Sequence, residues 1–186
     1  MLFKSEETKK IERAQIEISQ LFNAIIKCAF ENKQFPIVTA TSDRQYGRDL
    51  LTVLVGGKWT NPYDGISVPA DKIVEKLNPK LVNYLAHFTG KSLDHPLNAF
   101  RTCYVDPWGE PYNFAIDTNG DGIIEIHGQS YAHKGGSLIE EYILRIGQPV
   151  AIWSNGPNLR DDLGLGDDIA SWKFLSRVEW PKLTIS

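Results

Sequence analysis

The sequence predicts an α+β fold in which a long N-terminal helix packs on a small antiparallel β-sheet, with a helical unit inserted between the two. Three observations predict it. Residues 5–32 have the apolar spacing of a helix, residues 64–103 carry helix start and stop signals, and residues 104–180 hold short strands separated by Gly, Asn and Asp. The chain has 186 residues, of which 42% are hydrophobic, so residues 1–186 fit a single domain.

The N-terminal helix is predicted by apolar residues at alternating intervals of three and four, which line one helical face. These residues are Ile11, Ala14, Ile18, Leu21, Ile25 and Cys28. The first two turns are charged, so we expect the helix to contact the rest of the domain only beyond them. About 28 residues that rise 1.5 Å each extend roughly 42 Å, the diameter of a domain of this size. Pro36 lies just beyond the expected end of the helix.

Shorter helices are expected after the long one. A capping Ser-Asp pair and a closing pair of glycines bracket a helix over residues 44–55. Within residues 64–103, residues 69–77 form a short amphipathic run, and Asn78 precedes a second helix over residues 79–88. We therefore expect residues 64–103 to form an inserted helical unit.

The second half of the chain carries the strand signals. Residues 112–116 alternate as in a half-buried strand, residues 117–122 are rich in turn formers, and residues 123–126 read as the return strand. Residues 127–148 are expected to form a polar excursion with a short apolar run at residues 142–146, and residues 149–153 the next strand. An antiparallel sheet that packs one face on the long helix follows from this order.

Charge and cysteine content exclude several classes of protein. The net charge is −3 and the basic residues are scattered, so we expect no nucleic-acid interface. Cys28 and Cys103 have no Cys/His cluster around them, which argues against a zinc site. Cys28 falls on the apolar helix face and is expected to be buried, and the sequence leaves its pairing with Cys103 open.

Catalytic motifs do not appear in the sequence. It has no Gly-x-Ser-x-Gly elbow, P-loop, dinucleotide fingerprint or His-Glu-x-x-His motif. We therefore expect the chain not to be an enzyme. An unrecognised hydrolase would require a deep pocket with convergent titratable groups.

One turn combines two prolines, a glycine and two large aromatic residues. Pro107 and Pro111 each restrict one φ angle, and Gly109 between them can adopt backbone angles closed to other residues. Trp108 and Tyr112 each present a large apolar body with one polar group. The complete turn consists of Asp106, Pro107, Trp108, Gly109, Glu110, Pro111 and Tyr112. Such a turn is typical of a structural scaffold.

An acidic loop after residue 153 offers oxygen ligands for a metal ion. The candidate ligands are Asn158, Asp161, Asp162, Asp167 and Asp168. Hard oxygen donors on a glycine-rich loop suit calcium better than zinc or copper. Four carboxylates held together repel one another unless a cation, or a basic partner such as Arg160, neutralises them.

A second acidic segment is the weaker alternative metal loop. Asp117, Asn119 and Asp121, followed by glycine, copy the opening of an EF-hand loop. The twelfth position, which should be a bidentate Glu, is Gly128, and no helices flank the segment. A plain turn explains these residues more simply.

The turn at residues 106–112 and two runs downstream resemble the pseudopilins of type II secretion systems, and within them the major pseudopilin. The downstream runs are Trp153-Ser154-Asn155-Gly156-Pro157-Asn158 and Asp167-Asp168-Ile169-Ala170-Ser171-Trp172. The N-terminal helix followed by Phe35-Pro36 resembles the family's spine helix. Asn158 falls where the family often has Asp, which implies weaker calcium binding.

The resemblance implies a pilin-like fold and a structural, non-enzymatic role. It implies a calcium-stabilised loop and, as partners, other pseudopilin subunits in a homo- or hetero-filament and the secretion machinery. The family attaches to the membrane through a hydrophobic N-terminal helix on the periplasmic side of the bacterial inner membrane. This sequence carries no such helix, and we expect it to begin where the membrane helix ends.

A calcium-dependent binding module, extracellular or periplasmic, is the alternative. In that case the segments 64–103 and 127–148 would form a ligand surface. The sequence does not distinguish a secretion pseudopilus from a related type IV pilus-like filament.

Overall fold

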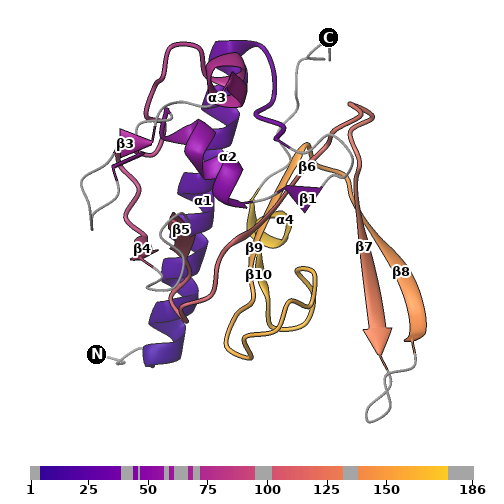
Figure 1. Ribbon diagram of the computed structural model, residues 1–186. Helices are drawn as coiled ribbons and strands as arrows, with labels where there is room; N and C mark the ends of the chain where they lie inside the picture. The colour runs from indigo at the N-terminus through magenta and orange to yellow at the C-terminus, as the bar shows by residue number, and fades with distance from the viewer. Residues whose placement is uncertain are drawn as a thin grey trace.

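A long helix lies beside a small antiparallel sheet (Figure 1). The computed structural model describes residues 5–38, 44–45, 47–56, 59–60, 67–68, 72–94, 102–131 and 138–175. The main sheet consists, in spatial order, of β1 (Arg44–Gln45), β6 (Asn113–Ile116), β9 (Val150–Ser154) and β10 (Ile169–Ala170). All three pairings in it are antiparallel. The expected combination of a long helix with antiparallel sheet is confirmed.

The long helix α1 (Glu6–Asn32) matches the predicted boundaries, residues 5–32, to within one residue. Ser5 caps it, because its hydroxyl oxygen accepts the backbone N–H of Thr8 at 3.1 Å. Lys33, in the left-handed conformation with φ of 57°, ends it three residues before Pro36. Residues 5–10 are exposed, and the buried face begins at Ala14. The helix therefore contacts the domain only after its charged first turns, as predicted.

The main core lies between α1 and the sheet. Ile18, Leu21 and Ile25 of the helix pack in one apolar cluster with Ile116 and Ile152 of the sheet. Two further helices contribute to the helix layer, α2 (Gly47–Leu54) and the short α4 (Ser171–Phe174). All residues of β9 are buried, because a second apolar cluster covers the other face of this strand.

The second cluster contains a hairpin that the sequence did not predict. β7 (Ile124–Tyr131) pairs with β8 (Leu138–Ile146), and Figure 1 shows both on the opposite side of the sheet from α1. The polar excursion expected over residues 127–148 is therefore wrong for the described residues. The return strand expected over residues 123–126 also does not pair with β6, which lies between β1 and β9. The physical reason is burial: Ile124, Ile126 and Ile146 pack against Trp153.

Residues 64–103, expected to form an inserted helical unit, are only partly helical where the structure describes them. Their described parts are β3 (Ser67–Val68), which pairs with β2 (Trp59–Thr60), then α3 (Lys72–Leu77), β4 (Lys91–Asp94) and β5 (Thr102–Val105), the last two forming a pair. The helix expected over residues 79–88 is wrong, since this stretch forms turns. Asn78 is fully buried and its amide donates to the Val53 carbonyl of α2 at 2.8 Å. Leu81 adopts a positive φ of 50°, which an α-helix does not allow.

Cys28 is a free, buried cysteine on α1, as its position on the apolar face predicts. Burial raises the pKa of its thiol to about 12, so it stays protonated at neutral pH. The side chain of Cys103 lies outside the described residues. Within the part of the chain that the structure describes, no helix has the length and apolar character needed to cross a membrane.

Candidate metal centre

The acidic loop connects β9 to β10 over residues 155–168. The pairing of Ser154 with Ile169 closes its base. Gly156, at a positive φ of 64°, lets the chain turn back on itself. A Cβ at this position would lie 2.5 Å from the backbone oxygen of Asp167, so only glycine fits. The two ends of the loop are thereby held against each other.

The fold of the loop brings three of the five predicted ligands together. One carboxylate oxygen each of Asp162, Asp167 and Asp168 lies within 4.8 Å of the other two. Asp167 is exposed, Asp162 is half-buried and Asp168 is buried. Three carboxylates at this separation repel one another in the absence of a cation.

Asp168 has one carboxylate oxygen that the protein leaves without a hydrogen bond. Its Oδ2 accepts the backbone N–H groups of Asp162 at 3.1 Å and of Gly164 at 2.8 Å. Its Oδ1 has no hydrogen-bond partner and is out of reach of solvent, because only 2% of the residue is exposed. A buried unpaired carboxylate oxygen is costly, and a bound cation would satisfy it.

The electrostatics of Asp168 reflect the same arrangement. Burial raises the pKa of its carboxyl to about 6, the Gly164 N–H opposes the shift, and the charges of Asp162 and Asp161 add to it. The carboxylate is therefore poorly stabilised by the protein alone. The donor set is compatible with a hard cation that prefers oxygen ligands, such as calcium.

Asn158 lies between two of the carboxylates. Its side-chain amide donates to Asp162 at 3.0 Å and also to Asp167, whose other oxygen accepts the Asn158 backbone N–H at 3.1 Å. Its side-chain oxygen accepts the backbone N–H of Arg160 at 2.7 Å. The amide hydrogens of Asn158 thus partly neutralise the charge that a metal ion would neutralise. To act as a ligand, Asn158 would have to rotate its oxygen towards the carboxylates.

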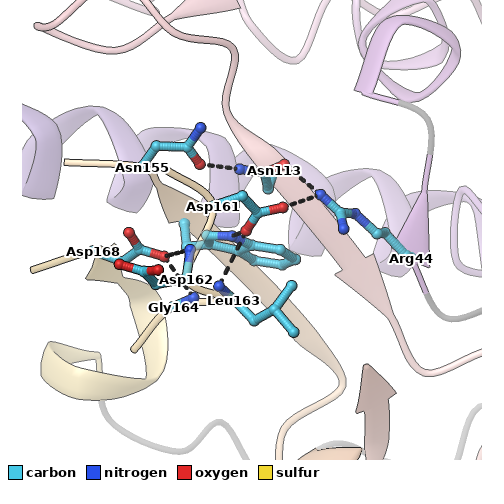
Figure 2. A network of polar contacts seen from close by, with 9 residues as sticks. Arg44, Asn113, Asn155, Asp161, Asp162, Leu163, Gly164 and Asp168 are labelled. Atoms are coloured by element: carbon cyan, nitrogen blue, oxygen red, sulfur yellow. Dashed lines mark hydrogen bonds and ion pairs between the residues drawn. The ribbon is translucent and has the colours of Figure 1, made fainter. Parts of the chain in front are cut away.

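Asp161 is not part of the cluster, and its prediction as a ligand needs correction. Its Oδ1 accepts the indole N–H of Trp153 at 2.8 Å, and its Oδ2 forms an ion pair with Arg44 (Figure 2). Arg44 also lies 5.6 Å from the centre of the Trp153 ring and donates to Asn113. Asp161 therefore anchors the loop to β1 and β9, and Arg44 extends the network to Asn113 of β6. The sequence suggested Arg160 as a basic partner for these carboxylates, but Arg44 forms the ion pair with Asp161.

The turn at residues 106–112 is held by its own aspartate. Asp106 Oδ1 accepts the backbone N–H groups of Trp108 at 3.0 Å and of Glu110 at 2.9 Å. Gly109 adopts a positive φ of 98°, as its place between the two prolines predicts. Asp106 Oδ2 accepts the hydroxyl of Ser154 at 2.5 Å. The turn and the base of the acidic loop are thus joined, a contact that sequence reasoning missed.

The alternative metal loop folds as a turn. Both carboxylate oxygens of Asp117 accept backbone N–H groups at 2.7 Å, one from Gly120 and one from Gly122. The Asn119 side-chain oxygen accepts the backbone N–H of Asp121. The Asp121 carboxylate accepts the backbone N–H of Ile123. These side chains stabilise their own turn, as in the plain-turn interpretation.

Coordination of a hard cation by carboxylate oxygens is the chemistry that the acidic loop can perform. Comparisons of the chain with protein-family models, with curated proteins and with solved structures found no match in any of the three.

Proposed function

We propose that this chain is a non-enzymatic structural subunit of a type II secretion pseudopilus or a related type IV pilus-like filament, and that its acidic loop binds calcium. The observation that carries the proposal is the hydrogen bond from Ser154 to Asp106. It joins two of the segments that carry the resemblance to pseudopilins, the turn at residues 106–112 and the run at residues 153–158. These segments are separate in sequence but form one structural unit.

The arrangement of helix and sheet supports a structural role. α1 is a rod of 27 residues with an exposed, charged beginning and one face that is buried from Ala14 onwards. Such a helix presents the sheet domain at a fixed orientation, which a filament subunit requires. The expected partners are other pseudopilin subunits and the secretion machinery, on the periplasmic side of the bacterial inner membrane.

The acidic loop supports calcium as the cofactor. Asp162, Asp167 and Asp168 supply three carboxylates, and the Asp168 Oδ1 has no protein partner. Calcium takes six to eight oxygen ligands in flexible geometry, so a glycine-containing loop can complete the shell with backbone carbonyls. Asn158 in place of an Asp lowers the charge of the site.

A complementation experiment tests the filament role. The gene would be deleted from its source organism and restored as wild type, as Asp168→Ala, or as Asp161→Asn as a matched control outside the carboxylate cluster. We expect loss of exoprotein secretion or of filaments on deletion, rescue by the wild type and by Asp161→Asn, and weak rescue by Asp168→Ala. Normal secretion and normal filaments in the deletion strain would contradict the proposal.

A calcium-dependent binding module is the second candidate. The observation that favours it is the β7–β8 hairpin, which has no strand neighbours in the described sheet topology and lies away from α1 (Figure 1). Antibody labelling of cells that overproduce the protein distinguishes the two candidates. Labelled filaments favour the subunit, and label released as single molecules favours the module.

A further inference from the structure

A series of hydrogen bonds and one close backbone contact connects α1 with the acidic loop. It begins at Glu17, the first buried carboxylate of the helix, of which 1% is exposed. Glu17 accepts the Arg13 guanidinium N–H at 2.6 Å with one oxygen and the Tyr112 hydroxyl at 2.6 Å with the other. A buried carboxylate held in this way ties α1 to the end of the turn at residues 106–112.

Hydrogen bonds within the turn hold the segment between Asp106 at its start and Tyr112 at its end. The backbone of Asp106 donates to the Glu110 carbonyl at 2.8 Å and accepts from Gly109 at 3.0 Å, while its side chain accepts two further N–H groups of the turn. Both ends of the turn are also bridged by the pairing of Val105 with Pro111. The turn is therefore rigid, and its two ends do not move independently.

The last contacts reach the acidic loop at residues 155–168. The fully buried Ser154 donates its hydroxyl to Asp106 and accepts the backbone N–H of Gly156 at 3.1 Å. Gly156 packs on the backbone of Asp167, which adjoins Asp168 in the carboxylate cluster. We call Glu17, Tyr112, Asp106, Ser154 and Gly156 the relay.

We propose that cation binding at the acidic loop stabilises the docking of the first half of α1 through the relay. A cation that draws the three carboxylates together fixes the backbone at Asp167 and therefore at Gly156. Ser154 then holds Asp106, and the rigid turn holds the Tyr112 hydroxyl against Glu17. Without the cation, repulsion among the carboxylates loosens this end of the relay.

The first half of α1 is the part of the helix that depends on the turn. Its residues before Ala14 are exposed or half-buried, and Trp108 contacts them by donating to Glu7 at 3.1 Å and by lying 6.0 Å from the Lys10 ammonium. These surface contacts are weak compared with the buried bond at Glu17. Local opening of this half of the helix should therefore report the state of the turn.

The relay rests on the calcium site of the proposed function. Amide hydrogen exchange of residues 6–20, measured in saturating calcium and in EDTA, tests it. In the wild type we expect calcium to slow exchange roughly fivefold, at the lower end of typical coupling between sites. Tyr112→Phe removes only the hydroxyl that reaches Glu17 and should reduce the calcium effect to below about twofold. Ser154→Ala, which cuts the relay in its middle, should do the same.

A matched control is available on the same helix. The Tyr84 hydroxyl donates to Glu31 at 2.9 Å and accepts from Asn32 at 3.2 Å, near the other end of α1. Tyr84→Phe therefore also removes a tyrosine hydroxyl from a glutamate of α1, but outside the relay. It should retain the full effect of calcium on residues 6–20.

Three outcomes would overturn the relay, and calorimetric titration with calcium separates them from failure of the site. If calcium binds and the exchange of residues 6–20 does not change in the wild type, the relay is wrong while the site stands. If the calcium effect survives in both Tyr112→Phe and Ser154→Ala, the coupling takes another route. If the wild type binds no calcium, the site and the relay both fail. The wild-type comparison holds even where a variant does not fold.

Discussion

The two acidic loops have similar composition and opposite designs. In the turn at residues 117–122, both oxygens of the buried Asp117 accept backbone N–H groups of the same turn. In the loop at residues 155–168, the buried Asp168 receives two backbone N–H groups on one oxygen and none on the other. Composition alone therefore does not make a metal site. A site requires oxygens that the local backbone leaves unsatisfied.

The difference arises from how each segment folds. The short turn places Gly120 and Gly122, both at positive φ, so that their amides point at Asp117. The longer loop folds back at Gly156 and brings Asp167 and Asp168 against Asp162, so carboxylates face carboxylates. The first loop satisfies its buried carboxylate, whereas the second leaves one buried oxygen of Asp168 without a partner.

The largest expected effect separates the two loops by their response to calcium. Calcium at ten times its Kd should stabilise the wild type by about 1.4 kcal/mol, which raises the melting temperature by roughly 3 to 6 °C. Asp168→Ala should abolish this increase and also lose about 1–3 kcal/mol, because it leaves the buried Gly164 N–H unpaired. Asp117→Ala should be destabilised equally with calcium and with EDTA. Thermal unfolding measures all three, and a calcium response that disappears in Asp117→Ala would reverse the comparison.

The pH dependence of the calcium-free protein should differ between wild type and Asp168→Asn. The pKa of Asp168 is raised from 3.8 to about 6 by burial, so the folded protein binds this proton more tightly than the unfolded chain. Asp168 therefore contributes stability below about pH 4, and this contribution is lost as the pH rises through about 6. We expect the wild type to lose stability relative to Asp168→Asn between pH 4 and 7. A constant difference in melting temperature over that range would contradict the prediction.

A substitution at Asn158 should increase the difference in calcium response between the loop at residues 155–168 and the turn at residues 117–122. Asn158→Asp removes the amide that donates to Asp162 and Asp167 and adds a fourth charge. We expect calcium to bind roughly fivefold more tightly, because affinity rises with ligand charge, and the EDTA form to be less stable. Calorimetry measures the affinity. Weaker calcium binding would show that the amide itself is needed at the site.

The smallest effect is expected at Asp161, which lies in the same loop but outside the cluster. Asp161→Asn removes the charge that pairs with Arg44 and retains an oxygen for the Trp153 indole N–H. The pair is partly exposed, so stability should fall by less than about 1 kcal/mol. Calcium affinity should stay within about twofold, whereas Asp162→Asn should lower it several-fold. Equal losses of affinity in both variants would place Asp161 among the ligands.

Elements with a strong local pattern were predictable from the sequence. The three-and-four spacing predicted α1 to within one residue at its start, and alternation predicted the strand that became β6. The short apolar run at residues 149–153 predicted the strand that became β9. The acidic loop was predictable because its residues are close in sequence and surrounded by glycines. In each case the information lies within a few residues of the element.

Elements that depend on distant partners were not predictable. Asn78 resembles a helix cap, but its amide is used by the Val53 carbonyl of α2. Residues 127–148 were expected to form a polar excursion with a short apolar run at residues 142–146, yet where the structure describes them they belong largely to the β7–β8 hairpin, in which Leu144 and Ile146 pack in the cluster with Trp153. Both errors come from reading a residue by its neighbours in sequence when a contact with a distant segment determines its conformation.

By itself, the sequence determined the long helix, the antiparallel strands of the core and the position of two acidic segments, because periodicity and turn chemistry act over short distances. Only the tertiary structure decided which carboxylates face one another. In the tertiary structure Asp161 forms an ion pair with Arg44, one oxygen of Asp168 has no partner, and Asp106 is hydrogen-bonded to Ser154. The physical reason is that hydrogen-bond satisfaction of a buried carboxylate depends on every donor within about 3 Å, whatever its place in the chain.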